Sequence, residues 1–102
     1  MSELASKQFY ERHADLCRVF SNAKRLKLLD LLKNGEEYTV SELQSHSDIP
    51  QSTISQHLKV MRTQEIVTRR KEGVKSYYSI TDERFVDGME LMGEVLVERD
   101  QE

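Results

Sequence analysis

The 102-residue sequence predicts a mainly α-helical fold with one small β-hairpin, in the order α-α-α-α-β-β-α. Three observations predict it. Residues 50–63 carry apolar side chains at helical spacing and a polar opposite face. Residues 66–80 are rich in β-branched and aromatic types around a charged turn at Glu72-Gly73. Four further segments read as helices, so we expect one domain that spans residues 1–102.

The first two helices are predicted from apolar spacing and from a capping residue. Residues 3–20 place four side chains on one stripe, Phe9, His13, Leu16 and Phe20. Ser21 and Asn22 interrupt this pattern and can cap a second helix over residues 23–33. Leucines surround most of that second helix, and a helix that is apolar nearly all round is usually buried. We therefore expect it at the centre of the core.

Two short helices joined by a polar turn follow. Thr39 and Glu42 fit a capping box at the start of the first, which should end near residue 46. Residues 47–50 form the turn, and Pro50 suits the first turn of the next helix. That helix places three apolar side chains on one face, Ile54, Leu58 and Met61. The pair is typical of a helix-turn-helix, whose second helix enters the major groove of DNA.

A hairpin and a last helix complete the chain. Strands over residues 66–71 and 75–80 flank Gly73 and form a wing. The dipeptide Thr81-Asp82 is expected to cap a helix over residues 83–98. Its apolar stripe consists of Phe85, Met89, Met92 and Leu96. The complete pattern predicts a winged helix-turn-helix.

The charge is unevenly distributed along the chain, whose net charge is −3. Residues 51–80 hold six basic and two acidic groups, a local balance of +4. Residues 81–102 hold two basic and eight acidic groups, a balance of −6, and residues 1–50 have a balance of −1. Because local potential decides where a polyanion docks, the middle third is the candidate surface for double-stranded DNA.

The polar face of the second helix and the basic hairpin supply the candidate DNA contacts. The helix offers Gln51, Ser52, Thr53, Ser55, Gln56, His57, Lys59 and Arg62. The hairpin adds phosphate contacts from Arg69, Arg70, Lys71 and Lys75. For His57 the sequence leaves two roles open, packing beneath the helix or holding a phosphate. It also leaves open a winged helix used for protein interaction or assembly, with weak or no DNA binding.

These segments resemble the ArsR/SmtB family of dimeric winged-helix transcriptional repressors over nearly the full length of the chain. The resemblance lies in residues 22–32 (NAKRLKLLDLL), 40–43 (VSEL), 52–58 (STISQHL) and the ending Gly73…Tyr78-Ser79-Ile80-Thr81-Asp82. It implies a homodimer paired through its first and last helices, with the two stripes above as the interface. It also implies two recognition helices on a palindromic operator and repression that a ligand relieves.

The metal sites of that family can be compared residue by residue. Arsenic- and cadmium-type members carry Cys-Val-Cys where this sequence has Thr39-Val40-Ser41, and hydroxyls do not replace thiolates for soft metals. The positions of the zinc-type site hold Asp82, Arg84, Val95 and Glu98, which lack both imidazoles. We therefore expect no metal site and no cofactor. Any inducer is unknown.

Several other classes are not expected. No nucleophile–base pair, P-loop or metal quartet is visible, so an enzyme is not predicted. No apolar run approaches the ~20 residues that span a bilayer, and the polar amino terminus does not read as a signal peptide. The single cysteine, Cys17, is compatible with a reducing cytoplasm and is expected to be a small buried hydrophobe, although a redox role stays open. The prediction is a cytoplasmic transcription regulator.

Overall fold

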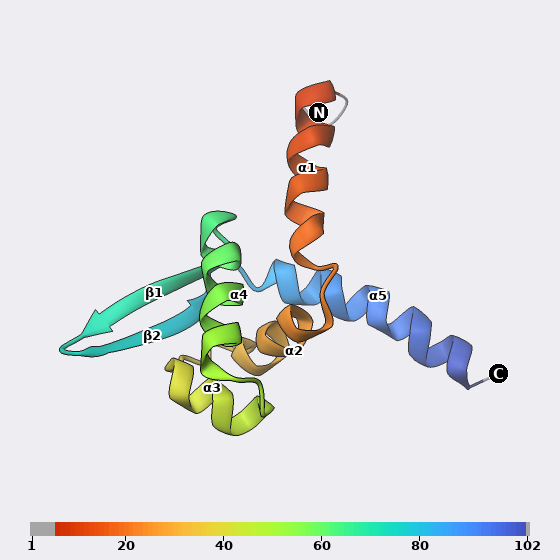
Figure 1. The fold of residues 1–102 in the computed structure, drawn as a ribbon. Helices are drawn as coiled ribbons and strands as arrows, with labels where there is room; N and C mark the ends of the chain where they lie inside the picture. The colour runs from red at the N-terminus through yellow and green to blue at the C-terminus, as the bar shows by residue number, and fades with distance from the viewer. Residues whose placement is uncertain (1–5, 102) are drawn as a thin grey trace.

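The computed structural model describes residues 6–101 as five helices and a two-stranded antiparallel hairpin, which confirms the predicted order (Figure 1). The elements are α1 (Lys7–Val19), α2 (Ala23–Leu32), α3 (Val40–Ser47), α4 (Gln51–Thr63), β1 (Val67–Glu72), β2 (Lys75–Ile80) and α5 (Arg84–Asp100). The predicted beginning of the first helix at residue 3 lies outside the described residues. Within residues 6–101, no helix is both long and apolar enough to cross a bilayer.

The core forms around α2, as its leucines predict. Leu28, Leu29 and Leu32 are all 0% exposed. They pack in one cluster with buried side chains from the rest of the fold, Leu43, Ile54, Leu58, Met61 and Ile66. Each fully buried side chain of this size contributes roughly 1.5–3 kcal/mol relative to an exposed one. This packing fixes α4 by its apolar face, so its polar face is directed outward.

Side-chain caps begin the first three helices. The Asn22 side chain accepts hydrogen bonds from the backbone N–H groups of Lys24 and Arg25, at 3.0 and 3.1 Å. The predicted capping box is present: Thr39 N–H donates to Glu42 at 2.9 Å, and Glu42 N–H donates to the Thr39 hydroxyl at 3.2 Å. These hydrogen bonds with Thr39 hold the pKa of Glu42 below its ordinary value. At α1 the Ser6 hydroxyl accepts from a backbone N–H at 3.0 Å.

The turn between α3 and α4 is short and internally bonded. Asp48 ends α3 in the left-handed region, with φ of 60°. The Ser47 hydroxyl donates to the Leu43 carbonyl at 2.6 Å and accepts from Ile49 N–H at 3.2 Å. Pro50 is the N-cap of α4 and does not lie in its first turn, because its ψ of 143° is extended while its carbonyl already accepts the first helical hydrogen bond.

The end of α4 explains why β1 begins one residue later than predicted. Glu65 has φ of 58°, and its N–H bonds to the Arg62 carbonyl, while Ile66 N–H bonds to the Met61 carbonyl. This pair of bonds is a Schellman motif, so Ile66 belongs to the helix terminus. Pairing starts at Val67, opposite Ile80.

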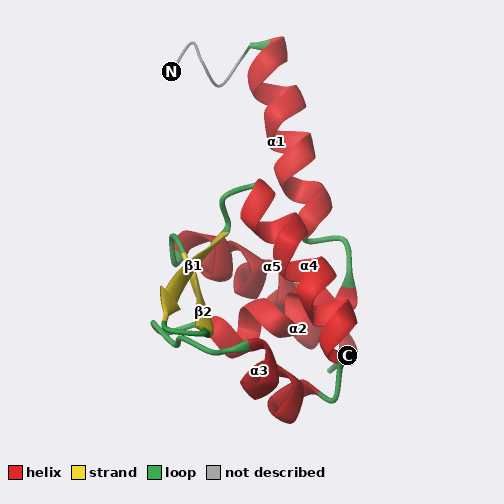
Figure 2. Cartoon of the chain, turned by 60° about the vertical axis from the view of Figure 1, so that its left-hand side comes forward, coloured by secondary structure: helices red, strands yellow, loops and turns green. Residues whose placement is uncertain are grey.

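The hairpin is attached to the helix-turn-helix through backbone pairing. Tyr38, just before α3, exchanges backbone hydrogen bonds of 3.1 and 2.8 Å with Tyr78 of β2. At the other end of the hairpin, Gly73 has φ of 62°, a conformation that glycine adopts without steric cost. Figure 2 shows the hairpin beside α3 and α4, well away from the far end of α1. The wing therefore has a defined position relative to α4.

The start of α5 partly corrects the predicted cap. The N-cap of α5 is Glu83, whose side chain makes no capping hydrogen bond, while Asp82 just before it accepts from the backbone N–H of Arg84 at 3.0 Å. Thr81 does not cap the helix, because its hydroxyl donates to the carbonyls of Glu65 and Ile66 at 2.7 and 3.0 Å. The Arg84 side chain and its backbone N–H lower the pKa of Asp82 to about 2.

Candidate nucleic-acid interface

The outer face of α4 carries the candidate base-reading residues. Six of the eight predicted α4 residues are exposed, Gln51, Ser52, Ser55, Gln56, Lys59 and Arg62, whereas Thr53 and His57 are half-buried. The Gln51 side-chain amide donates to the Ser41 hydroxyl of α3 at 3.3 Å. The exposed set begins at the amino-terminal turn of α4, which is the part of a recognition helix that reaches base edges.

A groove with basic walls lies between the second half of α4 and β1. Lys59 and Arg62 line it from α4, and Arg69 lines it from β1, with Glu65 as the one acidic residue of its lining. Arg69 shares a strand face with buried Val67, because side chains alternate along a strand. Within residues 6–101, none of these three cations has a carboxylate within ion-pair distance. Their charges are therefore available to an external anion.

The opposite face of the hairpin is different, because its arginine is already paired. Arg70 Nη1 lies 2.7 Å from Glu72 Oε2, and its Nε lies 3.2 Å from Glu37 Oε2. Its guanidinium also lies 4.8 Å from the centre of the Tyr77 ring. The hydrogen bonds to Glu72 and Glu37 raise the pKa of Arg70, and Arg70 in turn lowers the pKa of Glu72.

The four predicted hairpin cations therefore fall on two faces. Strand alternation places Lys71 on the face of Arg69, toward α4. Lys75 pairs in register with Glu72 and lies on the other face, where it lines a second groove with Glu42. The sequence treats the four cations alike. It gives no signal for Glu37, which comes from a loop 33 residues before Arg70.

His57 lies on the flank of α4 that faces α2. Its Nδ1 is 3.4 Å from Nη1 of Arg25, a residue that the sequence did not single out. Burial of the ring lowers the pKa of His57, and the charges of Arg25 and Lys24 lower it further. The half-buried ring packs against Arg25, as the first of the two roles left open for it requires, and phosphate binding stays a prediction.

The predicted dimer residues divide into two groups. Leu16, Phe20, Phe85 and Met89 are half-buried against the core of their own chain, and the rings of Phe20 and Phe85 lie 6.2 Å apart. Phe9 is half-buried farther out on α1, and His13 is exposed. On α5, Met92 and Leu96 are 64% and 59% exposed.

The outer half of α5 exposes more apolar surface than the predicted stripe. Leu91, Val95 and Val97 are also 45–63% exposed, and Tyr10 of α1 is 59% exposed. Figure 1 shows α1 and α5 extending away from the remaining elements, which explains why these side chains find no cover within the chain. The expectation that Cys17 is buried is wrong for this chain by itself, because Cys17 lies exposed on α1, which projects from the rest of the chain.

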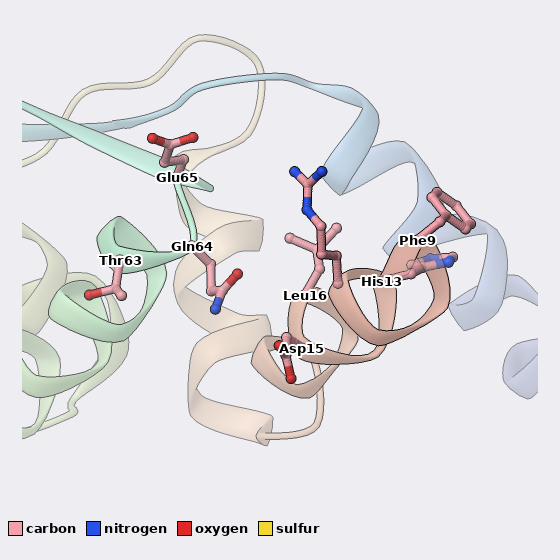
Figure 3. Close-up of a pocket in the computed structure, with 8 residues that line it drawn as sticks. Phe9, His13, Asp15, Leu16, Thr63, Gln64 and Glu65 are labelled. Carbon is pink, nitrogen blue, oxygen red and sulfur yellow. The ribbon is translucent and has the colours of Figure 1, made fainter. Parts of the chain in front are cut away.

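Two of the positions that hold metal ligands in metal-sensing members of the family are engaged in contacts within this chain. Thr39 caps α3, and Asp82 forms an ion pair with Arg84 at 2.7 Å. In the part of the chain that the structure describes, no three histidine, cysteine or carboxylate groups are placed to hold a metal ion. A hollow does lie between α1 and the end of α4, lined by Phe9, His13 and Leu16 of α1 and by the segment Thr63–Glu65 (Figure 3).

A helix-turn-helix on a three-helix core, followed by an antiparallel hairpin, defines the winged helix-turn-helix class. The family sequence model described as "Bacterial regulatory protein, arsR family" matches residues 22–69, which contain α2, α3 and α4. The chain is 34% identical over 86 residues to the uncharacterized HTH-type transcriptional regulator MJ1325 of Methanocaldococcus jannaschii, across 84% of this chain and 97% of that protein. The chain therefore belongs to the ArsR family.

Two further relatives support this assignment. An arsenical resistance operon repressor of Staphylococcus xylosus is 37% identical over 78 residues, which are 76% of this chain and 73% of that protein. The homodimeric winged helix-turn-helix DNA-binding domain of Mb0332 from Mycobacterium bovis matches with a TM-score of 0.78 and 27% identity, over 90% of this chain and 84% of that one. These relatives are transcriptional regulators, in agreement with the prediction that the chain is not an enzyme.

Proposed function

We propose that this chain is a sequence-specific repressor that binds a palindromic DNA operator as a homodimer, with residues 1–102 acting as one domain. The observation that carries the proposal is the unpaired basic groove of Lys59, Arg62 and Arg69 beside the exposed polar face of α4. The homodimeric M. bovis domain and the S. xylosus repressor support it by likeness.

The two parts of the interface have different roles in this proposal. Gln51, Ser52, Ser55 and Gln56 meet base edges, where their short or flexible donors and acceptors discriminate between base pairs. The basic groove binds phosphates, which adds affinity for every sequence and makes that affinity salt-dependent. We assign Arg70 the task of holding the hairpin to the loop of Glu37, with a smaller share of phosphate binding.

The dimer is proposed to form through the projecting helices. Five apolar side chains in the outer half of α5 are 45–64% exposed, and clustered apolar exposure of this kind is typical of a surface that binds another protein. A second copy that packs its own α1 and α5 there would cover both surfaces and place two α4 helices on one side of the dimer. Half-sites one helical turn of DNA apart, roughly 34–36 Å, are the spacing that such dimers read.

The proposal includes no metal-sensing site and no cofactor. The Thr39 hydroxyl is engaged in the capping box, and Asp82 is engaged by Arg84. Both positions therefore have structural partners, and neither supplies the thiolates or imidazoles that thiophilic metals and zinc require.

Salt dependence of duplex binding tests the proposal against the alternative of a protein-interaction module. A DNA reader that neutralises several phosphates loses affinity along a straight line of log K against log salt, with a slope of about −0.9 per phosphate. We expect this slope, together with a preference for particular genomic fragments over duplex of mixed sequence. Weak, salt-independent association without preference would favour the interaction module.

A further inference from the structure

Arg25 connects three helices at the side of α4 opposite the hairpin. Its Nε donates to the Val19 carbonyl at 2.7 Å, and its Nη2 donates to the Arg18 carbonyl at 3.2 Å. Both carbonyls end α1, where the helix dipole favours a cation. Its Nη1 lies 3.4 Å from His57 Nδ1, so the first turn of α2 joins the end of α1 to the recognition helix.

The chemistry of this contact determines which ring nitrogen carries the proton. A guanidinium only donates hydrogen bonds and stays charged at any ordinary pH. Nδ1 of His57 must therefore be the acceptor, and the neutral ring carries its proton on Nε2. Among residues 6–101, no hydrogen-bond partner of Nε2 is present, and no buried side-chain nitrogen or oxygen lacks a partner. Nε2 consequently reaches the surface as an unused donor.

The surroundings of this donor are positive. Lys24 precedes Arg25 in the first turn of α2 and is exposed. Asp15, near the end of α1, is already in an ion pair with Arg18. No carboxylate of the described chain forms an ion pair with Lys24 or Arg25. An anion that approached the ring would meet an N–H donor and an unpaired ammonium group.

The position of this surface matches the second edge of a major groove. A helix in the major groove lies between two phosphate backbones. Figure 1 shows the hairpin on one side of α4 and the start of α2 on the other. The groove of Lys59, Arg62 and Arg69 serves one side. On the other side, His57 is the one α4 candidate for a phosphate contact, and it lies beside Arg25 at the start of α2.

We propose that Lys24, Arg25 and His57 form a second phosphate-binding surface, on the side of α4 opposite the hairpin. Lys24 and the Nε2–H group of His57 contact phosphate, and Arg25 is the positioning residue that holds the ring in the required tautomer. This inference rests on the proposed DNA binding. It adds contacts to the phosphates of the DNA strand on the other side of the major groove. It also means that the end of α1 helps to position the recognition helix.

Two measurements test the inference independently. The first records imidazole ¹⁵N shifts in the free protein, at a pH about two units above the ordinary histidine pKa. We expect the Nε2–H tautomer at His57 in the wild type and a mixture of tautomers in Arg25→Lys, which keeps the charge but lacks the planar fork. A wild-type Nδ1–H tautomer would overturn the role assigned to Arg25, whether or not the protein binds DNA.

The second measurement is fluorescence anisotropy with a mixed-sequence duplex of roughly 30 base pairs, about three helical turns. Each lost phosphate contact makes the slope of log K against log salt shallower by about 0.9. Over a fourfold rise in salt, the variant therefore loses about 3.5-fold less affinity than the wild type. We expect this change for Lys24→Gln, and a loss of about threefold or more in affinity for His57→Phe. Lys33→Gln, the same change at the other end of α2 where Lys33 is paired with Asp30, should leave binding unchanged.

The two variants of the contact should also be non-additive. Because Arg25 acts on phosphate only through the ring, Arg25→Lys combined with His57→Phe should bind no more weakly than the weaker single variant. If the wild type binds duplex but Lys24→Gln and His57→Phe bind as tightly as Lys33→Gln, the second phosphate-binding surface is overturned. A wild type that binds no duplex at low salt would overturn the proposed function, and the phosphate contacts with it.

Discussion

The division of the hairpin into two faces predicts that adjacent arginines differ in DNA binding. Arg69 lines the basic groove without an ion-pair partner in the described chain, whereas Arg70 is paired with Glu37 and Glu72. Substituting Arg69→Gln should remove a phosphate contact. Substituting Arg70→Gln removes a charge that two carboxylates already balance, so its direct effect on phosphate binding should be much smaller.

The magnitude follows from counterion release. If Lys59, Arg62 and Arg69 each neutralise one phosphate, together they contribute about −2.7 to the slope, which is about a 40-fold loss of affinity between 50 and 200 mM salt. In Arg69→Gln, two phosphate contacts remain, and together they account for about a 12-fold loss of affinity between the same two salt concentrations. Arg70→Gln should have a slope much closer to that of the wild type than to that of Arg69→Gln.

Anisotropy titrations of one duplex at four or five salt concentrations measure these slopes directly. Both variants remove one charge from adjacent positions of β1, so each is the control for the other. Thermal unfolding followed by circular dichroism checks that both remain folded, which they should because both side chains are exposed. An Arg70→Gln slope as shallow as that of Arg69→Gln would refute the assignment of phosphate binding to the groove.

Three further predictions concern assembly, metal binding and pH. Met92→Glu places a charge in the exposed apolar surface of α5, so in sedimentation equilibrium the wild type should be a dimer and the variant a monomer; an unchanged dimer would place the interface elsewhere. Equilibrium dialysis should find no tight zinc binding, and one tightly bound ion per chain would contradict the interpretation that Thr39 caps α3 and Asp82 is engaged by Arg84. The pKa of His57 is lowered in the folded state, so the unfolded state binds more protons and the free energy of unfolding should fall as pH drops below about 6.5. His57→Phe should lose this component of the pH dependence in urea unfolding, and an identical dependence in both proteins would mean that another group causes it.

Local chemistry was predictable from the sequence because it acts over a few residues. The Asn22 cap and the Thr39–Glu42 box depend on spacings of two or three residues, and both are present. The leucines of α2 predicted the centre of the core because a helix that is apolar nearly all round is usually buried. The two strands were predicted from the β-rich segments that flank Gly73, but the turn lies one residue later than predicted, at Gly73-Val74, because Glu72 pairs with Lys75 in the sheet.

Contacts between distant segments were not predictable in the same way. Arg25 meets His57 across 32 residues, and Arg70 meets Glu37 across 33. Neither pair has a characteristic spacing, because only the packed fold brings the partners together. The exposure of Cys17 was missed for a related reason: the apolar stripe of α1 predicts burial, but the helix projects from its own chain.

The central claim is that α4 reads a particular DNA sequence. The most direct measurement compares the affinity for a duplex selected from genomic fragments with the affinity for a scrambled duplex of equal length, at physiological salt. We expect the selected duplex to bind more tightly, with a ratio of the two affinities of about 1,000 or more. Gln56→Ala, which removes one exposed candidate reader from the outer face of α4, should reduce that ratio without changing the salt slope. A wild-type ratio near one would contradict the claim, even if both duplexes bound tightly.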